Sequence, residues 1–158
     1  MNEKIFIAPG AHVVGEVHMG ENVGIWYNAV VRGDTNSITI GDNTNVQDNT
    51  TIHTDSDFQV HIGEGVTIGH NAIVHGCTIG DNTVIGMGSI LLSGAVIGEN
   101  CIIGAGSLVT GKMRIPENSL AFGNPAKVVR AVTTEEIKSN QENAAHYVQL
   151  MKENTEGL

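Results

Sequence analysis

The sequence has few aromatic residues, with one Trp, two Tyr and three Phe among its 158 residues. A chain of this length is expected to form one domain with its own core, and we expect small and β-branched side chains to fill it. Cysteine is also scarce. The two Cys residues, Cys77 and Cys101, show no CxxC spacing, so we expect both to be buried, reduced thiols of a cytoplasmic protein.

Positive charge is limited to 8 Lys and Arg residues against 17 Asp and Glu residues, which gives a net charge of −9. The basic residues form no cluster, and this argues against nucleic acids and anionic membrane surfaces as partners. The segment 1–17 contains no long apolar run. We therefore expect neither a signal peptide nor a membrane span.

The chain does have a repeat of six residues. Aliphatic or small residues recur with this spacing at Ile79, Ile85, Leu91, Ile97, Ile103, Val109, Ile115 and Ala121. An amphipathic helix has a period of 3.6 and a half-exposed strand a period of 2, so neither explains the pattern. A period of six is typical of a hexapeptide β-helix, in which each unit forms one face of a triangular coil. The sequence thus predicts an all-β solenoid, a parallel β-helix, over residues 1–130.

The same phase continues upstream with interruptions, at Val13, Met19, Ile25, Val31, Ile40, Val46, Ile52, Ile62 and Ile68. Three extra residues fall in the segment RGDTNS (32–37) and four in the segment HTDSDF (53–58). We expect both segments to project as short loops. One residue is missing before Ile79, which predicts a tightened corner near Val74.

The last segment, 131–158, has the features of a helix that packs along the solenoid. Thr133 or Thr134 provides an N-cap, and Glu135 and Glu136 place negative charge in the first turn. An apolar stripe follows at Ile137, Ala144, Val148 and Met151. We expect this helix to run to about Glu153, with residues 154–158 frayed.

The repeat phase also assigns residues to the three faces of the coil. Face A carries Val31, Ile52 and Val74, face B carries Ile40 and Ile62, and face C carries Val46 and Ile68. Arg32, His53 and His75 each follow a face-A position in successive coils, so they should form one column. The other histidines, His12, His18, His61 and His146, have no such relationship, and we interpret them as structural or solvent-facing.

A second polar set, Gln47, Asp48 and His70, follows face C and lies near a different edge of the triangle. One chain does not easily bring the two sets together, but face A of one chain can meet face C of the next. Closure of this contact around a threefold axis gives a trimer. The spacing therefore predicts a site formed by His53 and His75 of one subunit with His70 of its neighbour, and it predicts that Arg32 and Asp48 meet across the same seam.

Three neutral imidazoles on one divalent ion leave a fourth position open, as in catalytic zinc sites that lower the pKa of a bound water to roughly 7. Such a water is a usable hydroxide at neutral pH. Gln47 and Asn45 are then candidates to orient water or substrate by hydrogen bonds. Asp34, Arg32 and Asp48 are candidates to order the groups around the ion.

The segments Arg32-Gly33-Asp34, Asn45–Asp48, His53 and Gly69–Cys77 together resemble the γ-class carbonic anhydrases. The resemblance covers nearly the whole chain. It implies a left-handed β-helix, a homotrimer, and a zinc ion (or iron or cobalt) bound by His53, His70 and His75 across the subunit interface. It also implies that Arg32 and Asp48 form an intersubunit ion pair, that Gln47 is an active-site amide, and that Tyr147 lies near the site.

The sequence departs from strongly active members of that family, which carry glutamates after the Arg-Gly-Asp-like segment and in a longer acidic loop. Here Thr35 follows Asp34, and the short loop 54–59 contains Asp55 and Asp57 but no Glu. Release of a proton from a metal-activated water needs a relay, so this difference bears on the rate of CO₂ hydration.

Three functions remain open at this stage. They are a zinc-dependent hydratase for CO₂ and bicarbonate, a thioesterase or acyltransferase acting on acyl-CoA, and a non-catalytic metal-binding scaffold. The segment NSLAFGNPA (118–126) resembles the closing segment of hexapeptide acyltransferases, although Gly123 and Pro125 also explain it as the exit from the coil.

Overall fold

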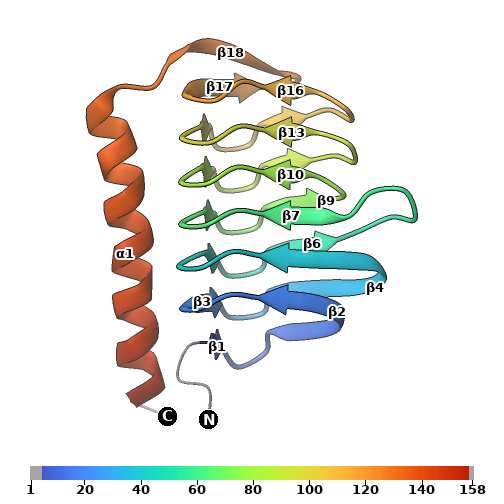
Figure 1. The fold of residues 1–158 in the computed structure, drawn as a ribbon, viewed down its shortest axis with the longest axis vertical. Helices are drawn as coiled ribbons and strands as arrows, with labels where there is room; N and C mark the ends of the chain where they lie inside the picture. Colours follow the sequence, from blue (N-terminus) through green and yellow to red (C-terminus); the bar gives the residue numbers. More distant parts are fainter. Residues whose placement is uncertain (1–4, 157–158) are drawn as a thin grey trace.

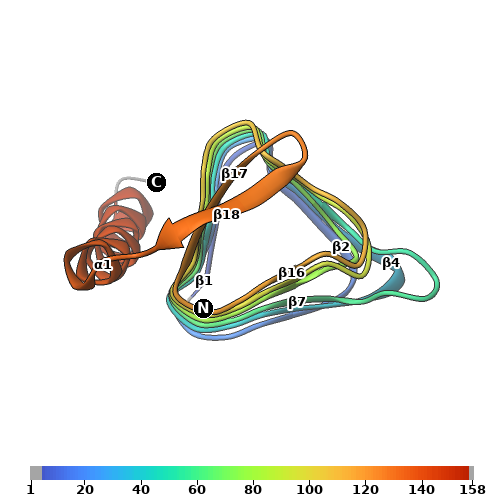
Figure 2. The ribbon, with the colours of Figure 1, turned by 90° about the horizontal axis from the view of Figure 1, so that it is seen from above.

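The computed structural model describes residues 5–156, which form a parallel β-solenoid flanked by one helix (Figure 1). Each coil contributes one short strand to each side of a triangular prism (Figure 2). Seen from the C-terminal end, the chain turns clockwise as it rises toward the viewer, so the winding is left-handed. This is the fold class that the six-residue repeat and the family resemblance predict.

Face C of the prism is formed by β1 (Ile5–Ile7), β3 (Val23–Ile25), β5 (Asn45–Val46), β8 (Thr67–Ile68), β11 (Val84–Ile85), β14 (Ile102–Ile103) and β17 (Ser119–Gly123). Face A contains β6 (Thr51–His53), β9 (Ile73–His75), β12 (Ile90–Leu91) and β15 (Leu108–Val109). Face B contains β7 (Val60–Ile62), β10 (Thr78–Ile79), β13 (Val96–Ile97) and β16 (Arg114–Ile115). The longer β2 (His12–Met19) and β4 (Val30–Ile40) run through both faces A and B.

The aliphatic ladder of the repeat fills the interior of the prism. Every repeat position from Ile79 to Ala121 is buried, with side-chain exposures between 0 and 4%. The upstream positions from Ile25 to Ile68 are buried in the same cluster. Aromatic rings are absent from this cluster of the described residues. Small and β-branched side chains therefore fill the core, as the composition predicts.

The two insertions differ in structure. The residues after His53 form an irregular loop that projects from the corner between faces A and B, as predicted. The RGDTNS segment was expected to be a loop, but it remains extended as part of β4. It stays extended because β2 pairs with β4 on both sides of a register shift between Gly15 and Val17, which accommodates the extra residues.

The C-terminal helix, α1 (Thr134–Glu156), descends beside face C (Figure 1). It begins with a capping box. The backbone N–H of Glu136 donates to Thr133 Oγ1 at 3.1 Å, and the backbone N–H of Thr133 donates to the Glu136 carboxylate at 2.8 Å. Residues 154–156 were expected to fray but continue the helix, and Asn154 Nδ2 donates to the carbonyl of Leu150. The rest of the expected frayed tail lies outside the described residues.

A smaller cluster under the end of the helix contains Phe6, Trp26 and Met151. These side chains fix α1 against the lowest coils. At the other end, β18 (Ala126–Ala131) pairs with β17 in antiparallel orientation and crosses the open end of the prism (Figure 2). Within residues 5–156, no helical segment has both the length and the apolar character that a bilayer crossing requires.

Candidate metal centre

Parallel pairing on face A places three polar side chains in a column. Arg32 of β4 pairs with His53 of β6, and His53 pairs with His75 of β9. In each strand the preceding residue points into the core, so alternation turns these side chains outward. The column predicted from the repeat phase is therefore present in the structure.

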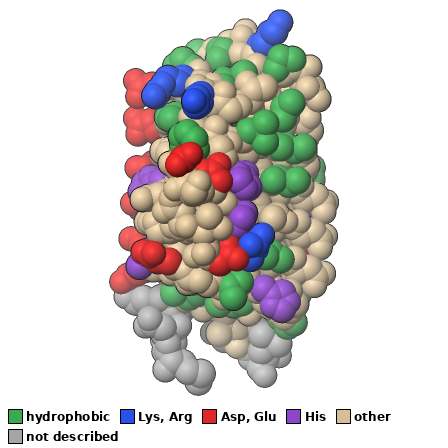
Figure 3. Space-filling view, turned by 90° about the vertical axis from the view of Figure 1, so that its right-hand side faces the viewer, with side chains coloured by type: hydrophobic (Ala, Val, Ile, Leu, Met, Phe, Trp, Pro, Cys, Tyr) green, Lys and Arg blue, Asp and Glu red, His purple; other side chains and the backbone are tan. Residues whose placement is uncertain are grey.

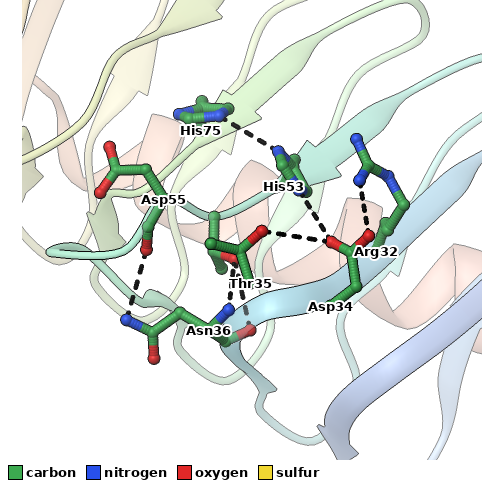
Figure 4. Close-up of polar contacts among 8 residues, drawn as sticks. Arg32, Asp34, Thr35, Asn36, His53, Asp55 and His75 are labelled. Atoms are coloured by element: carbon green, nitrogen blue, oxygen red, sulfur yellow. Dashed lines mark hydrogen bonds and ion pairs between the residues drawn. The ribbon is translucent and has the colours of Figure 1, made fainter.

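The two histidines face each other with converging nitrogens (Figure 4). His53 Nδ1 lies 3.3 Å from His75 Nε2, and the rings are inclined at 62°. Two imidazole ligands of one tetrahedral zinc ion, each bound at about 2.0–2.1 Å, would have nitrogens roughly 3.3 Å apart. The spacing of these atoms therefore fits two ligands of one ion.

The outer nitrogens of both rings have hydrogen-bond partners of their own. His53 Nε2 lies 3.0 Å from Asp34 Oδ1, and His75 Nδ1 lies 2.9 Å from Ser93 Oγ. When each outer nitrogen carries its proton toward these acceptors, the inner nitrogens present lone pairs to each other. Facing lone pairs repel unless a cation lies between them, so the donor set suits a metal ion.

Asp34 connects the column to Arg32. Arg32 Nη1 lies 2.7 Å from Asp34 Oδ2, and Thr35 Oγ1 lies 3.5 Å from the other oxygen (Figure 4). The hydrogen bond from Arg32, followed by that from His53, lowers the pKa of Asp34 to about 2. The carboxylate is therefore ionised at neutral pH and able to orient the His53 ring.

Ser93 of the coil above and Asp55 of the loop 54–59 in the coil below support His75. Ser93 Oγ donates to Asp55 Oδ2 at 2.5 Å, and the other Asp55 oxygen accepts the backbone N–H groups of Asp57 and Phe58. The hydrogen bond from Ser93 is the main cause of the lowered pKa of Asp55. Both Asp55 oxygens are engaged, which suits an anchor for the loop. Ser93 was not among the residues predicted from the sequence, although its place one coil above the His53–His75 column was a usable signal.

His70 lies at another corner of the prism, after face C. Its Nδ1 is 3.2 Å from Asp48 Oδ2, and about a third of its side chain is exposed. Among residues 5–156 of the single chain, no group of three His, Cys, Asp or Glu side chains converges on a common point. The structure thus brings His53 and His75 together but leaves His70 apart from them.

The remaining predicted site residues also fall into separate groups. Arg32 pairs with Asp34 and Asp48 with His70, so the chain by itself does not join Arg32 to Asp48. Asn45 and Gln47 are buried on the outer side of face C under α1, where Gln47 Nε2 donates to Asn45 Oδ1 at 3.1 Å.

Tyr147 of α1 packs edge-on against Trp26, with ring centroids 5.5 Å apart. Burial, followed by the charge of Asp48, raises the pKa of the Tyr147 phenol. This places the ring within electrostatic reach of the His70–Asp48 corner. Cys77 belongs to the buried core cluster, so it does not face the histidine column, and burial raises the pKa of its thiol to about 12.

Comparison with known proteins adds a second line of observation. Residues 59–92 and 76–111 match the family described as bacterial transferase hexapeptide (six repeats). A Methanocaldococcus jannaschii protein, named provisionally as a carbonic anhydrase, is 50% identical over 150 residues, which cover 95% of this chain and 94% of that protein.

The mitochondrial γ carbonic anhydrase 2 of Arabidopsis thaliana is 42% identical over 156 residues, covering 95% of this chain and 56% of the plant protein. Among solved structures, a Bacillus cereus protein named provisionally as an acetyltransferase superposes with a TM-score of 0.96 at 43% identity. That match covers 98% of this chain and 90% of the Bacillus chain.

Proposed function

Because this chain belongs to the γ-class carbonic anhydrase-like family of hexapeptide-repeat proteins, we propose that it is a metal-dependent enzyme that catalyses the reversible hydration of CO₂ to bicarbonate. One observation carries the proposal. The inner nitrogens of His53 and His75 converge at 3.3 Å while Asp34 and Ser93 hold the outer nitrogens. This arrangement of ligand and orienting groups is the one that protein metal sites use.

The third ligand in this proposal is His70 of a neighbouring subunit in a homotrimer. Face A supports it, because exposed apolar side chains flank the histidine column at Val14, Ile73, Ile90 and Leu92. We call these four residues the face-A patch. Figure 3 shows histidines in the middle of the exposed side, with hydrophobic side chains in a column beside them. Exposed apolar side chains gathered beside a functional column favour a contact with another subunit.

Zinc is the proposed metal, with iron or cobalt as alternatives of the same ligand preference. A divalent ion at this position would supply a water of lowered pKa for attack on CO₂. Residues of this chain orient the histidine ligand His53. Asp34 fixes the ring of His53, and Arg32 holds Asp34 in place through its own hydrogen bond.

Gln47 and Asn45 have a complementary role in the proposal. Gln47 donates one hydrogen bond to Asn45, and Asn45 Nδ2 donates to Thr67 Oγ1, so the carboxamide group of Gln47 is held in one orientation. Its oxygen is then the acceptor available to a water or substrate at the seam. Asp48 would orient His70 within its own subunit, and Tyr147 would close the side of the site next to α1.

Acyl-CoA hydrolysis or acyl transfer is the second candidate. The Bacillus cereus neighbour named as an acetyltransferase favours it. A cavity of about 310 Å³ also lies beside the loop 54–59, lined in part by His61, Thr78 and Arg114. Arg114 is a suitable partner for a phosphate group. We propose a cytoplasmic location for either activity, since both thiols are free.

The first experiment measures CO₂–bicarbonate isotope exchange by the zinc-loaded protein beside a His53→Ala control. The proposal expects a metal-dependent rate well above the control. Wild-type protein that binds the metal but shows no exchange above the control would contradict it. Turnover of an acyl-CoA thioester under the same conditions would then support the second candidate, and its absence would support a scaffold.

The shared site has a separate test that does not require turnover. Chains carrying His70→Ala are mixed, unfolded and refolded with chains carrying His53→Ala. If the ligands come from two subunits, about one quarter of the seams receive all three histidines, and metal binding returns to that level. Mixtures that bind no more metal than either variant alone would show that all ligands lie within one subunit.

A further inference from the structure

The corner between faces B and C, which lies next to α1, carries a vertical row of equivalent turn residues. We call this row the corner ladder, and its members are Asn22, Asn43, Gly65, Asn82, Asn100 and Asn118. All six have positive φ values, between 53° and 64°. From Asn43 upward, the backbone N–H of each member donates to a carbonyl of an earlier coil at 2.8 or 2.9 Å. The six positions are therefore structurally equivalent, and only Gly65 has no side chain.

The asparagine side chains of the corner ladder form a directed chain of amide hydrogen bonds. Asn22 Nδ2 donates to Asn43 Oδ1 at 3.0 Å, Asn82 Nδ2 donates to Asn100 Oδ1 at 2.9 Å, and Asn100 Nδ2 donates to Asn118 Oδ1 at 3.1 Å. Every step runs from a lower coil to the next higher one. An amide at position 65 would accept from Asn43 and donate to Asn82.

Gly65 interrupts this chain and leaves two amide groups without their ladder partners. Asn82 Oδ1 is buried and has no hydrogen-bond partner within residues 5–156. Asn43 uses its oxygen to accept from Asn22, and its Nδ2 makes no hydrogen bond in the same part of the chain. A buried acceptor without a donor is destabilising, so a group that supplies a donor in the gap would be stabilising.

The gap opens into a cavity of about 490 Å³ between the solenoid and α1. Beside the ladder positions 43, 65 and 82, its lining includes Glu64 and Asp81 of the solenoid and Gln141, Ala144, Ala145 and Val148 of α1. A Cβ atom added to Gly65 would meet nothing within 4 Å. One water occupies about 30 Å³ of liquid, so the space holds a larger molecule. On the helix side, Ala144, Ala145 and Val148 are apolar and Gln141 is polar. The carboxylates of Glu64 and Asp81 disfavour an anion.

We propose that this cavity binds a small molecule with a primary carboxamide group, which takes the place of the missing ladder side chain. Its NH₂ group donates to Asn82 Oδ1, and its carbonyl oxygen accepts from Asn43 Nδ2. The rest of the molecule lies against Ala144, Ala145 and Val148. A carboxylate lacks the donor that Asn82 needs, and an ammonium lacks the acceptor that Asn43 needs.

The site is separate from the candidate metal centre. The helix stands at one corner of the prism, whereas β4 and the loop 54–59 project from another (Figure 2). Loss of metal ligands therefore leaves the cavity intact, and occupation of the cavity leaves the His53–His75 pair untouched. If the carboxamide proposal fails, the proposed metal centre is unaffected, and the reverse also holds.

The test uses ¹⁵N-labelled trimer or monomer, as purified, and propionamide as the probe. We expect saturable shifts of the side-chain amide signals of Asn43 and Asn82 with propionamide, and no such shifts with propionate. Gly65→Asn should abolish the response, because its side chain completes the corner ladder and Asn tolerates a positive φ. Gly106→Asn is the matched control, since Gly106 also has a positive φ and open space around its Cβ at a different corner.

The outcomes are distinct. Shifts of equal size in wild type and Gly65→Asn, or equal shifts with propionate, would overturn the proposal. If the side-chain amide signals of the wild-type protein show no saturable shift with propionamide, the proposal is also overturned, and the cavity holds only water. Ala145→Leu provides a second variant should Gly65→Asn fold poorly, because the larger side chain occupies the cavity from the helix side. It should weaken propionamide binding at least 10-fold.

Discussion

The hydroxyl oxygen of Ser93 accepts a hydrogen bond from His75 Nδ1 at 2.9 Å. The direction of this hydrogen bond follows from the contact with Asp55. Ser93 donates its only hydroxyl proton to Asp55 at 2.5 Å, so its oxygen can only accept from His75. The proton of His75 is therefore on Nδ1, and the lone pair of Nε2 points toward His53. A serine on a neighbouring coil thus selects the imidazole tautomer that a metal requires.

The first prediction concerns Ser93→Ala. Loss of the hydroxyl leaves His75 free to rotate and to change tautomer, so zinc affinity should fall by about 10–100-fold. Competition with a chromophoric chelator measures the affinity. Ser56→Ala in the loop 54–59 is the control, because the Ser56 side chain is exposed. An unchanged affinity in Ser93→Ala would remove Ser93 from the proposed centre.

Two adjacent residues of β12 separate core packing from the proposed subunit contact. Leu91 is fully buried, whereas Ile90 of the face-A patch is 37% exposed. Leu91→Ala should lower the free energy of unfolding by about 2–5 kcal/mol in urea titrations. Ile90→Ala should change that free energy little but should raise the concentration at which the proposed trimer dissociates in sedimentation experiments. A fully monomeric wild type would contradict the second expectation.

Tyr147 tests whether the aromatic cluster is structural or chemical. Tyr147→Phe keeps the ring against Trp26 and should leave stability close to wild type. Tyr147→Ala removes the edge-on contact, which is worth about 0.5–1.5 kcal/mol in addition to the buried area. Thermal unfolding of both variants measures this. A large loss of CO₂ exchange in Tyr147→Phe at full stability would assign the phenol to the chemistry.

The helix cap predicts a pH dependence. The hydrogen bond from Arg130, followed by the backbone N–H of Thr133, lowers the pKa of Glu136 from 4.5 to about 2. A carboxyl with a depressed folded-state pKa stabilises the protein above its unfolded pKa and loses that effect as the pH falls through the folded value. At about pH 7, the urea midpoint of the wild type should therefore be higher than that of Glu136→Gln. The difference between the two midpoints should disappear as the pH falls from about 4.5 to about 2. A constant difference across that range would assign the stabilisation to neutral hydrogen bonds.

The period of six accounts for most of the fold. It places the buried side chains from Ile79 to Ala121. It also stacks Arg32, His53 and His75, because the extra residues of segments 32–37 and 53–58 follow the column positions and leave the pairing of Arg32, His53 and His75 in register. The period does not predict that residues 32–37 stay extended in β4. Three extra residues fit a loop and equally fit an extended strand that pairs across a register shift. Only the partner strand β2 distinguishes the two.

The supporting contacts of the candidate site were harder to predict than the ligands. Ser93 lies in a turn, and its contact with Asp55 depends on how the loop 54–59 folds back over the next coil. The gap in the corner ladder was also hidden. Asn and Gly both suit a positive φ, so Gly65 fits the turn as well as its neighbours, and the consequence appears only when the coils are stacked.

The antiparallel turn of β17 into β18 sets a limit on the length of the molecule. A bare end of a parallel solenoid is a template on which another copy could continue the winding, coil after coil, into a fibre. Here the chain doubles back across the open triangle before it enters α1, and an arriving parallel strand finds the direction of pairing reversed at that end of face C. β18 therefore prevents another copy from adding a parallel coil at the C-terminal end of the solenoid, and the coil cannot be extended in that direction.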